Sequence, residues 1–267
     1  MKSKPIIIDE DLLEFDLDFG DNSYDYNGIS VPRVTNILSS CTDQKGLISW
    51  AANVYPKEYH RVHNSSLRIG TMTHAKIDHF LSDLFGIKMP LIDEILDPFK
   101  NDYEERQAET ALNNFIEWFE SIKRMNYPIQ EVIGLEVPVV CPWFGGTIDA
   151  IVKINNFYYI IDFKTSKQIV PEYIIQTSAY MWVINNYYQN IFPHINGIGI
   201  IRVDKKESGI FEDYFINELI PEQNCMIYNA QKCFCSMVDT YYRTLYSSNQ
   251  YKDYQKVYKF SGTIRGK

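Results

Sequence analysis

The sequence predicts an α/β fold whose N-terminal half is mainly helical and whose strands follow later in the chain. Three observations carry this prediction. Residues 35–125 contain stretches with apolar side chains at helical spacing, residues 131–164 are rich in strand-forming residues, and a further helical segment precedes two more strands. No internal repeat and no linker divides the 267 residues, so we expect a single domain.

The first elements expected along the chain are a hairpin and three helices. An Asn-Gly pair flanked by strand formers predicts a hairpin within residues 24–31. Thr35 or Asn36 can begin the first helix, because both side chains suit the position that caps a helix N-terminus. Longer helices are expected over Ser65–Gly86 and Asp102–Arg124, where apolar residues recur at helical spacing.

The second half is expected to continue with strands and two helices. Pro171 suits the first turn of a helix that runs to about Tyr188. Strands are expected over Ile195–Val203 and Phe211–Ile216, joined by a polar turn. The single domain, 1–267, is thus divided into an acidic lead (1–20), a helical cap (about 30–125), a core (about 130–216), a C-terminal helix (219–247) and a basic tail (251–267).

Composition indicates a protein with a full hydrophobic core, since 45% of the residues are hydrophobic. No apolar run approaches a membrane span and the N-terminal residues lack a signal-peptide pattern, so we expect no membrane contact and a location in the cytoplasm or the interior of a host cell. The net charge of −8 argues against a generic nucleic-acid coat. A local basic groove stays compatible with it, because much of the acid lies in residues 9–25.

Two acidic residues in apolar strands are the main functional candidates. Asp149 ends the run Gly145–Asp149, and Asp162 precedes Lys164 in a second strand, where alternation places both on one face. Burying a carboxylate and an ammonium is costly unless they are paired, metal-bound or used in chemistry. A buried Asp162–Lys164 ion pair is the simpler alternative, but it does not require Asp149. Two acids that bind a hard cation beside a lysine suit hydrolysis of a phosphodiester.

The order of these motifs resembles the PD-(D/E)XK nuclease superfamily, in particular its RecB-like branch. The residues that carry the resemblance are Gly146 and Asp149, then Asp162-Phe163-Lys164-Thr165, then Gln176 and Tyr180. Further stretches that resemble mitochondrial genome maintenance and phage exonucleases are 31–38, 47–52 and 70–74. The resemblance implies a restriction-endonuclease-like fold, which is a central mixed sheet flanked by helices with a helical N-terminal cap.

The resemblance also implies a metal-dependent DNA nuclease, and an exonuclease on single-stranded DNA ends in replication, recombination or repair, viral DNA included, is the leading expectation. Mg²⁺ or Mn²⁺ would be held by Asp149, Asp162 and the backbone carbonyl of Phe163. Lys164 would position the water or stabilise the phosphate. An endonuclease or junction resolvase on the same core is one alternative, and a non-catalytic nucleic-acid-binding module is another.

Two further residues are expected at the metal by resemblance. His74 ends a G-x-x-x-H pattern, whose histidine approaches the metal in RecB-like nucleases; the alternative is a surface histidine bonded to Asp78. Glu136 resembles the acid that precedes G-x-x-D in the family, and the alternative is a solvent-facing glutamate on an edge strand.

Gln176 and Tyr180 are four residues apart and therefore share one helix face. With Thr165, they are expected to meet the DNA backbone or to orient the active site, although Tyr180 alone suits ordinary packing and Gln176 suits a surface.

The five cysteines indicate reduced thiols in the absence of a secretory signal. Some RecB-like nucleases hold an iron–sulfur cluster with one upstream and three downstream cysteines, as Cys41 and Cys225, Cys233 and Cys235 would allow. The downstream spacing lacks the close pair of cysteines typical of such ligands, so structural cysteines are favoured over a cluster.

Overall fold

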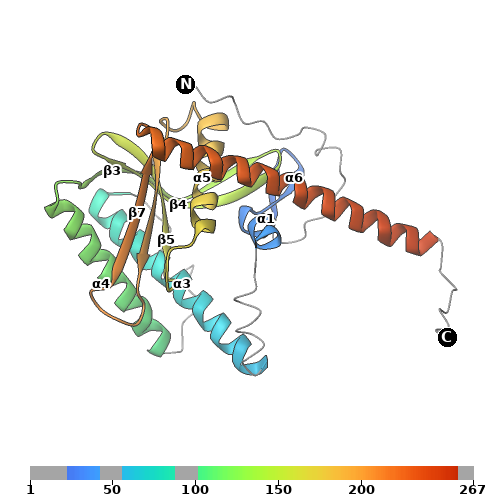
Figure 1. Cartoon of the computed structure of the whole chain (residues 1–267). Helices are drawn as coiled ribbons and strands as arrows, with labels where there is room; N and C mark the ends of the chain where they lie inside the picture. The colour runs from blue at the N-terminus through green and yellow to red at the C-terminus, as the bar shows by residue number, and fades with distance from the viewer. Residues whose placement is uncertain (1–22, 43–55, 88–101, 258–267) are drawn as a thin grey trace.

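Figure 1 shows the computed structural model, which describes residues 23–42, 56–87 and 102–257. The expected acidic lead, the stretch 47–52 and the end of the basic tail lie outside these residues. The whole span of the expected core, about 130–216, lies inside them.

The N-terminal half forms a hairpin and three helices within the described ranges. These elements are β1 (Ser23–Tyr26), β2 (Ile29–Pro32), α1 (Val34–Cys41), α3 (Pro56–Phe85) and α4 (Asp102–Arg124). The predicted hairpin is confirmed, since Asn27 and Gly28 have φ values of 52° and 86°, as a tight two-residue turn requires. The bounds of α4 are as predicted, whereas α3 begins well before the expected Ser65.

The central sheet has five strands in the order β3-β4-β5-β6-β7. They are β3 (Ile129–Cys141), β4 (Phe144–Ile154), β5 (Phe157–Lys164), β6 (Gly197–Val203) and β7 (Phe211–Asn217). Only the β5–β6 pair is parallel, and α5 (Pro171–Tyr187) supplies the crossover that a parallel pair needs. The predicted α/β fold with a mixed central sheet flanked by helices is therefore confirmed.

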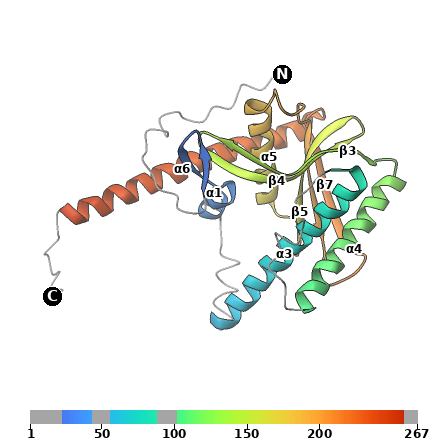
Figure 2. The same ribbon diagram turned by 180° about the vertical axis from the view of Figure 1, so that it is seen from behind.

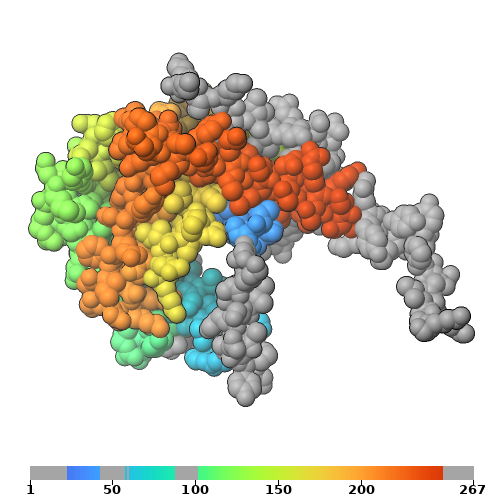
Figure 3. Space-filling model, in the orientation of Figure 1, coloured from blue at the N-terminus to red at the C-terminus, as the bar shows by residue number. Residues whose placement is uncertain are grey.

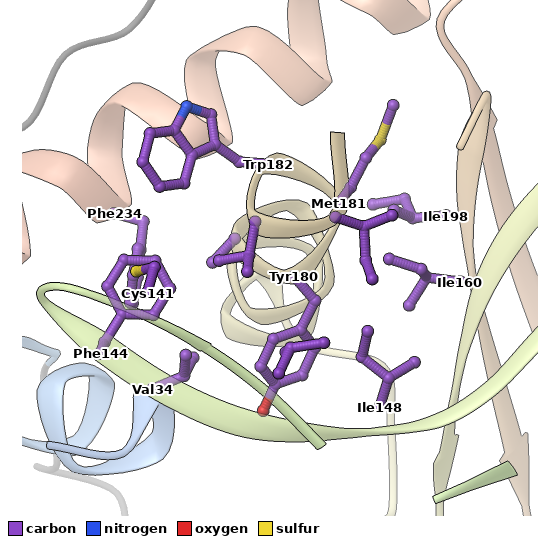
Figure 4. Close-up of a cluster of buried hydrophobic side chains, with 14 of the residues drawn as sticks. Val34, Cys141, Phe144, Ile148, Ile160, Tyr180, Met181, Trp182, Ile198 and Phe234 are labelled. Atoms are coloured by element: carbon purple, nitrogen blue, oxygen red, sulfur yellow. The ribbon is translucent and has the colours of Figure 1, made fainter. Parts of the chain in front are cut away.

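Helices cover both faces of this sheet (Figures 1 and 2). On one face α3 and α4 bury Ile161 and Phe163 of β5, while α5, α6 and α1 lie on the other face with Ile160 (Figure 4). This alternation along β5 is the one the sequence predicts. The side chains of Asp162 and Lys164 point to the face covered by α5, because they lie at alternate positions from Ile160 along the strand.

The last helix, α6 (Pro221–Val257), is longer than expected. Its first half packs on the core through buried residues such as Phe234 and Val238, and the hydroxyl of Tyr242 donates to the Trp143 carbonyl oxygen at 2.8 Å. Figures 1 and 3 show the second half extending away from the sheet. The expected end near 247 is wrong, since the helix includes 251–257 of the expected tail. Across the described ranges, no helix has both the length and the apolar character needed to cross a bilayer.

Candidate active site

The site forms where β4 separates from β5. Pairing of the two strands begins at Ala150 and Ile161, so the part of β4 that ends at Asp149 has no ladder partner on β5. The Asp149 side chain takes that place, because its Oδ2 accepts a hydrogen bond from the Phe163 backbone N–H at 2.7 Å. The β-strand geometry thus fixes the Asp149 carboxylate and the Phe163 backbone at one point.

Three of the expected residues come together around this point. His74 of α3, Glu136 of β3 and Asp149 each offer one ligand atom, and the three atoms lie within 4.8 Å of one another. His74 Nδ1 lies 3.6 Å from Asp149 Oδ1. Carboxylate oxygens with one imidazole suit Mg²⁺ or Mn²⁺, so the donor set fits the metal that the resemblance implies.

Glu136 owes its position to an unusual backbone. It lies between Leu135 and Val137, whose partners Ala150 and Ile148 flank Asp149, so it faces Asp149 across the β3–β4 ladder. Its φ of 47° is in the left-handed region, which is costly for a residue other than glycine and is concentrated at functional sites. Glu136 is exposed on an edge strand, as the alternative expected, yet its carboxylate joins the group of three.

His74 is directed at Asp149, whereas the alternative expected a histidine bonded to Asp78. Burial alone would lower the pKa of His74, but attraction to Asp149 outweighs it and raises the pKa to about 9. Burial would raise the pKa of Asp149, but the charge and hydrogen bond of His74, the charge of Lys164 and the Phe163 N–H together outweigh it and lower the pKa. A histidine held by a carboxylate beside a cation site is oriented for binding, and a metal would displace its proton.

Asp162 and Lys164 form the ion pair that the sequence offered as an alternative. The Lys164 ammonium donates to Asp162 Oδ1 at 2.8 Å and lies 2.7 Å from Oδ2, and Asp162 is only 3% exposed. Burial raises the pKa of Asp162 to about 6 even though Lys164 opposes the shift. Burial would lower the pKa of Lys164, but Asp162 and then Asp149 outweigh it and raise the pKa. Lys164 is therefore a fixed positive charge and is poorly suited to act as a base.

A chain of hydrogen bonds runs from Lys164 to two residues of α5. The Lys164 ammonium donates to Gln176 Oε1 at 3.3 Å, and the Gln176 amide donates to the Tyr180 hydroxyl at 3.4 Å. Tyr180 is 3% exposed and its ring fills the space above Gly146, where an added Cβ would lie 2.4 Å from the ring. Tyr173 covers Lys164 from another side, with the ammonium 4.7 Å from the ring centroid. The structure thus places Gln176 and Tyr180 as supports of Lys164.

Thr165 lies where β5 meets α3. A Cβ added to Gly70 would be 3.7 Å from Thr165 Oγ1, so the helix backbone passes close to this residue. The Phe163 ring packs edge-on against His74, with centroids 6.0 Å apart. The motif that contains Asp162 and Lys164 therefore also sets the position of α3 and, through it, of His74.

Asp78 is the residue that sequence reasoning assigned only as a partner of His74. It lies one turn after His74 on α3, is 3% exposed, and its Oδ1 has no hydrogen-bond partner within residues 23–42, 56–87 and 102–257. Burial, followed by the charge of Glu136, raises its pKa to about 8. The signal available in the sequence was its i,i+4 spacing from His74, which places both on one helix face.

The cysteines lie elsewhere. Cys41 donates to the Met237 carbonyl oxygen at 3.6 Å, Cys141 is buried, and Cys225 and Cys233 are exposed. Within residues 23–42, 56–87 and 102–257, the only group of three or more His, Cys, Asp and Glu side chains close enough to share an ion is that of His74, Glu136 and Asp149.

Comparison with known proteins matches this geometry to a family. The sequence model described as "PD-(D/E)XK nuclease superfamily" matches residues 53–221, more than half of the chain. That span contains every site residue described above. No curated protein gives a significant match.

Proposed function

The chain belongs to the PD-(D/E)XK nuclease superfamily, and from this premise we propose that it is a divalent-metal-dependent exonuclease acting on single-stranded DNA ends. The superfamily makes it a nuclease, a hydrolase with a nucleic-acid substrate. The observation that carries the proposal is the grouping of His74, Glu136 and Asp149 beside the Asp162–Lys164 pair. We expect this activity to act in DNA replication, recombination or repair. The DNA could include viral DNA inside a host cell.

The proposed cofactor is Mg²⁺ or Mn²⁺, held by Asp149, Glu136 and His74, with Asp162 and the Phe163 carbonyl oxygen as further oxygen donors. When bound, the ion would polarise the scissile phosphate and lower the pKa of a water ligand. Carboxylates that lie near one another repel, and His74 and Lys164 oppose this repulsion in the metal-free site. A bound cation would relieve it further.

Lys164 would stabilise the charge that develops on the phosphate. It stays protonated because Asp162 and Asp149 raise its pKa, and Gln176 and Tyr173 limit its movement. A positive charge that is already oriented needs no reorganisation during the reaction, which is the basis of electrostatic catalysis. Gln176 and Tyr180 act in this proposal by orienting Lys164, and Thr165, which lies beside α3, would contact the DNA backbone.

The preference for a single strand rests on charge and on the enclosure of the site. A protein with a net charge of −8 gains little from diffuse attraction to a duplex. The site lies between α3 on one side and α5 on the other, and Tyr173 is partly exposed above Lys164, where it can stack on an unpaired base. The presence of Asp149 together with the Asp162–Lys164 pair supports catalysis over a binding module that has only retained the fold, because a buried ion pair alone would not require Asp149.

The test compares four substrates: a linear single strand labelled at the 5′ end, the same strand labelled at the 3′ end, its circular form, and a blunt duplex. Each is incubated with the full chain in Mg²⁺, Mn²⁺ or EDTA. We expect cleavage of the linear strands with metal, loss in EDTA, and resistance of the circle. Equal rates on the circle would favour the endonuclease alternative, and faster cutting of the duplex would refute the single-strand preference.

A further inference from the structure

Asp78 is a buried acid that the proposed reaction does not yet use. It is 3% exposed, and its Oδ1 has no hydrogen-bond partner among the residues that the structure describes. An unpaired buried carboxyl oxygen costs free energy, because it has lost water without gaining another partner. Such groups are rare in folded proteins, and where they occur they often contact a bound ion or water.

The groups that act on Asp78 electrostatically are those of the metal site. They are Glu136 of β3, His74 of α3 and Asp149 of β4. The neighbouring residues Ile77 and Leu81 are fully buried in the core against α4, so the helix cannot turn this carboxyl away without exposing apolar side chains. The side chain is therefore held at the site by the packing of α3.

We propose that Asp78 is a positioning residue of the metal site, where it accepts a hydrogen bond from a water molecule bound to the ion that His74, Glu136 and Asp149 hold. The three ligand atoms lie within 4.8 Å of one another and Asp78 is outside this group, so contact through water is favoured over direct ligation. Mg²⁺ usually keeps several waters, which need acceptors. This inference rests on the metal-dependent function proposed above.

The test is a calorimetric titration of the full chain with Mn²⁺, together with thermal unfolding in EDTA and in Mn²⁺. For Asp78→Asn we expect Mn²⁺ affinity at least about 10-fold weaker, the scale of losses on removing an outer partner of a metal site. The melting temperature in EDTA should be unchanged or higher, because the substitution removes a buried carboxyl that neighbours other acids.

Asp83→Asn is the matched control on the same helix. Asp83 is exposed and pairs with His79, so its loss should leave Mn²⁺ affinity at the wild-type value. Asp78→Ser, which is smaller and still accepts a hydrogen bond, is the second variant if the asparagine does not fold.

The outcomes separate the two proposals. A lower melting temperature in EDTA with wild-type Mn²⁺ affinity would assign Asp78 a structural role and overturn this inference alone, as would failure of both variants to fold. Absence of Mn²⁺ binding by the wild type would overturn this inference and the proposed function together.

Discussion

At the scale of single residues, the site depends on charges that hold one another in place. Asp162 is buried beside Lys164, and Asp149 is held by the Phe163 N–H and by His74. A buried ion pair alone is weak evidence for function, since such pairs also occur as structural elements. The group is distinguished by a second and third acid that no buried pair requires.

Lys164→Ala should abolish most cleavage and leave Mn²⁺ binding intact or stronger. A protonated lysine offers no lone pair to a metal, and its removal relieves repulsion of the cation. Single-turnover cleavage and calorimetry on the same preparation measure the two effects. Lys153→Ala, at a lysine that packs on Tyr158 on the same sheet, serves as the control and should keep both properties. Loss of Mn²⁺ affinity in Lys164→Ala would show that the lysine organises the site and contradict a role in the reaction.

The sequence could predict most of this site but not all of it. Asp149, Asp162 and Lys164 carry a short ordered motif, and His74 follows a recognisable glycine spacing. The left-handed φ of Glu136 depends on how β3 pairs with β4, so no pattern in the neighbouring sequence predicts it. Asp78 was missed because its burial is a tertiary property, whereas its spacing from His74 suits a surface pair equally well.

At the scale of elements, the core strands and α4 were predictable because their hydrophobic patterns are continuous. The start of α3 and the end of α6 were not. Pro56 and Glu58 supply an N-terminal signal for α3, but the polar, histidine-rich turns that follow obscure the apolar face. No Gly or Pro follows Ser247 until residue 262, so nothing in α6 stops the helix at the expected position.

Contact between α5 and β4 should be sensitive to one added methyl group. Gly146→Ala would place a Cβ 2.4 Å from the Tyr180 ring, so we expect a loss of about 1–3 kcal/mol in the free energy of unfolding and reduced cleavage as Tyr180 and Gln176 shift.

Gly70→Ala is the matched control for this prediction. Its Cβ would lie 3.7 Å from Thr165 Oγ1, which is an ordinary contact, and alanine favours the helix by roughly 0.5–1 kcal/mol. Denaturant unfolding measures both variants. If the Gly146→Ala protein were as stable and active as the wild type, the close packing of Tyr180 on β4 would contribute neither to stability nor to cleavage.

At the scale of the whole molecule, the fold places acids from three strands and one helix around a single point. In the metal-free state the folded chain holds protons there more tightly than the unfolded chain does, since the pKa of Asp78 is raised from 3.8 to about 8 and that of His74 from 6.5 to about 9. Stability falls with rising pH wherever the native state binds more protons. The stabilisation from protonated His74 is complete below pH 6.5 and is lost as the pH passes 9.

The melting temperature in EDTA should therefore fall as the pH rises from about 5 to 9, and the increase caused by saturating Mn²⁺ should grow over the same range. Asp78→Asn should show a shallower fall in EDTA, because it removes one of the groups whose pKa the fold raises. Scanning calorimetry across this pH series measures the effect. A melting temperature that rises with pH in EDTA would contradict the charge arrangement described for the site.

The most direct test of the central claim is single-turnover cleavage of a labelled single-stranded oligonucleotide across a Mn²⁺ titration, by the wild type, Asp149→Asn and Asp162→Asn. We expect the wild-type rate to rise with Mn²⁺ and saturate at the affinity found by calorimetry. Both variants should be at least about 100-fold slower while keeping their helical signal in circular dichroism, because the change removes one carboxylate from the site that activates water and phosphate. Cleavage that persists in EDTA, or either variant turning over at the wild-type rate, would contradict the account.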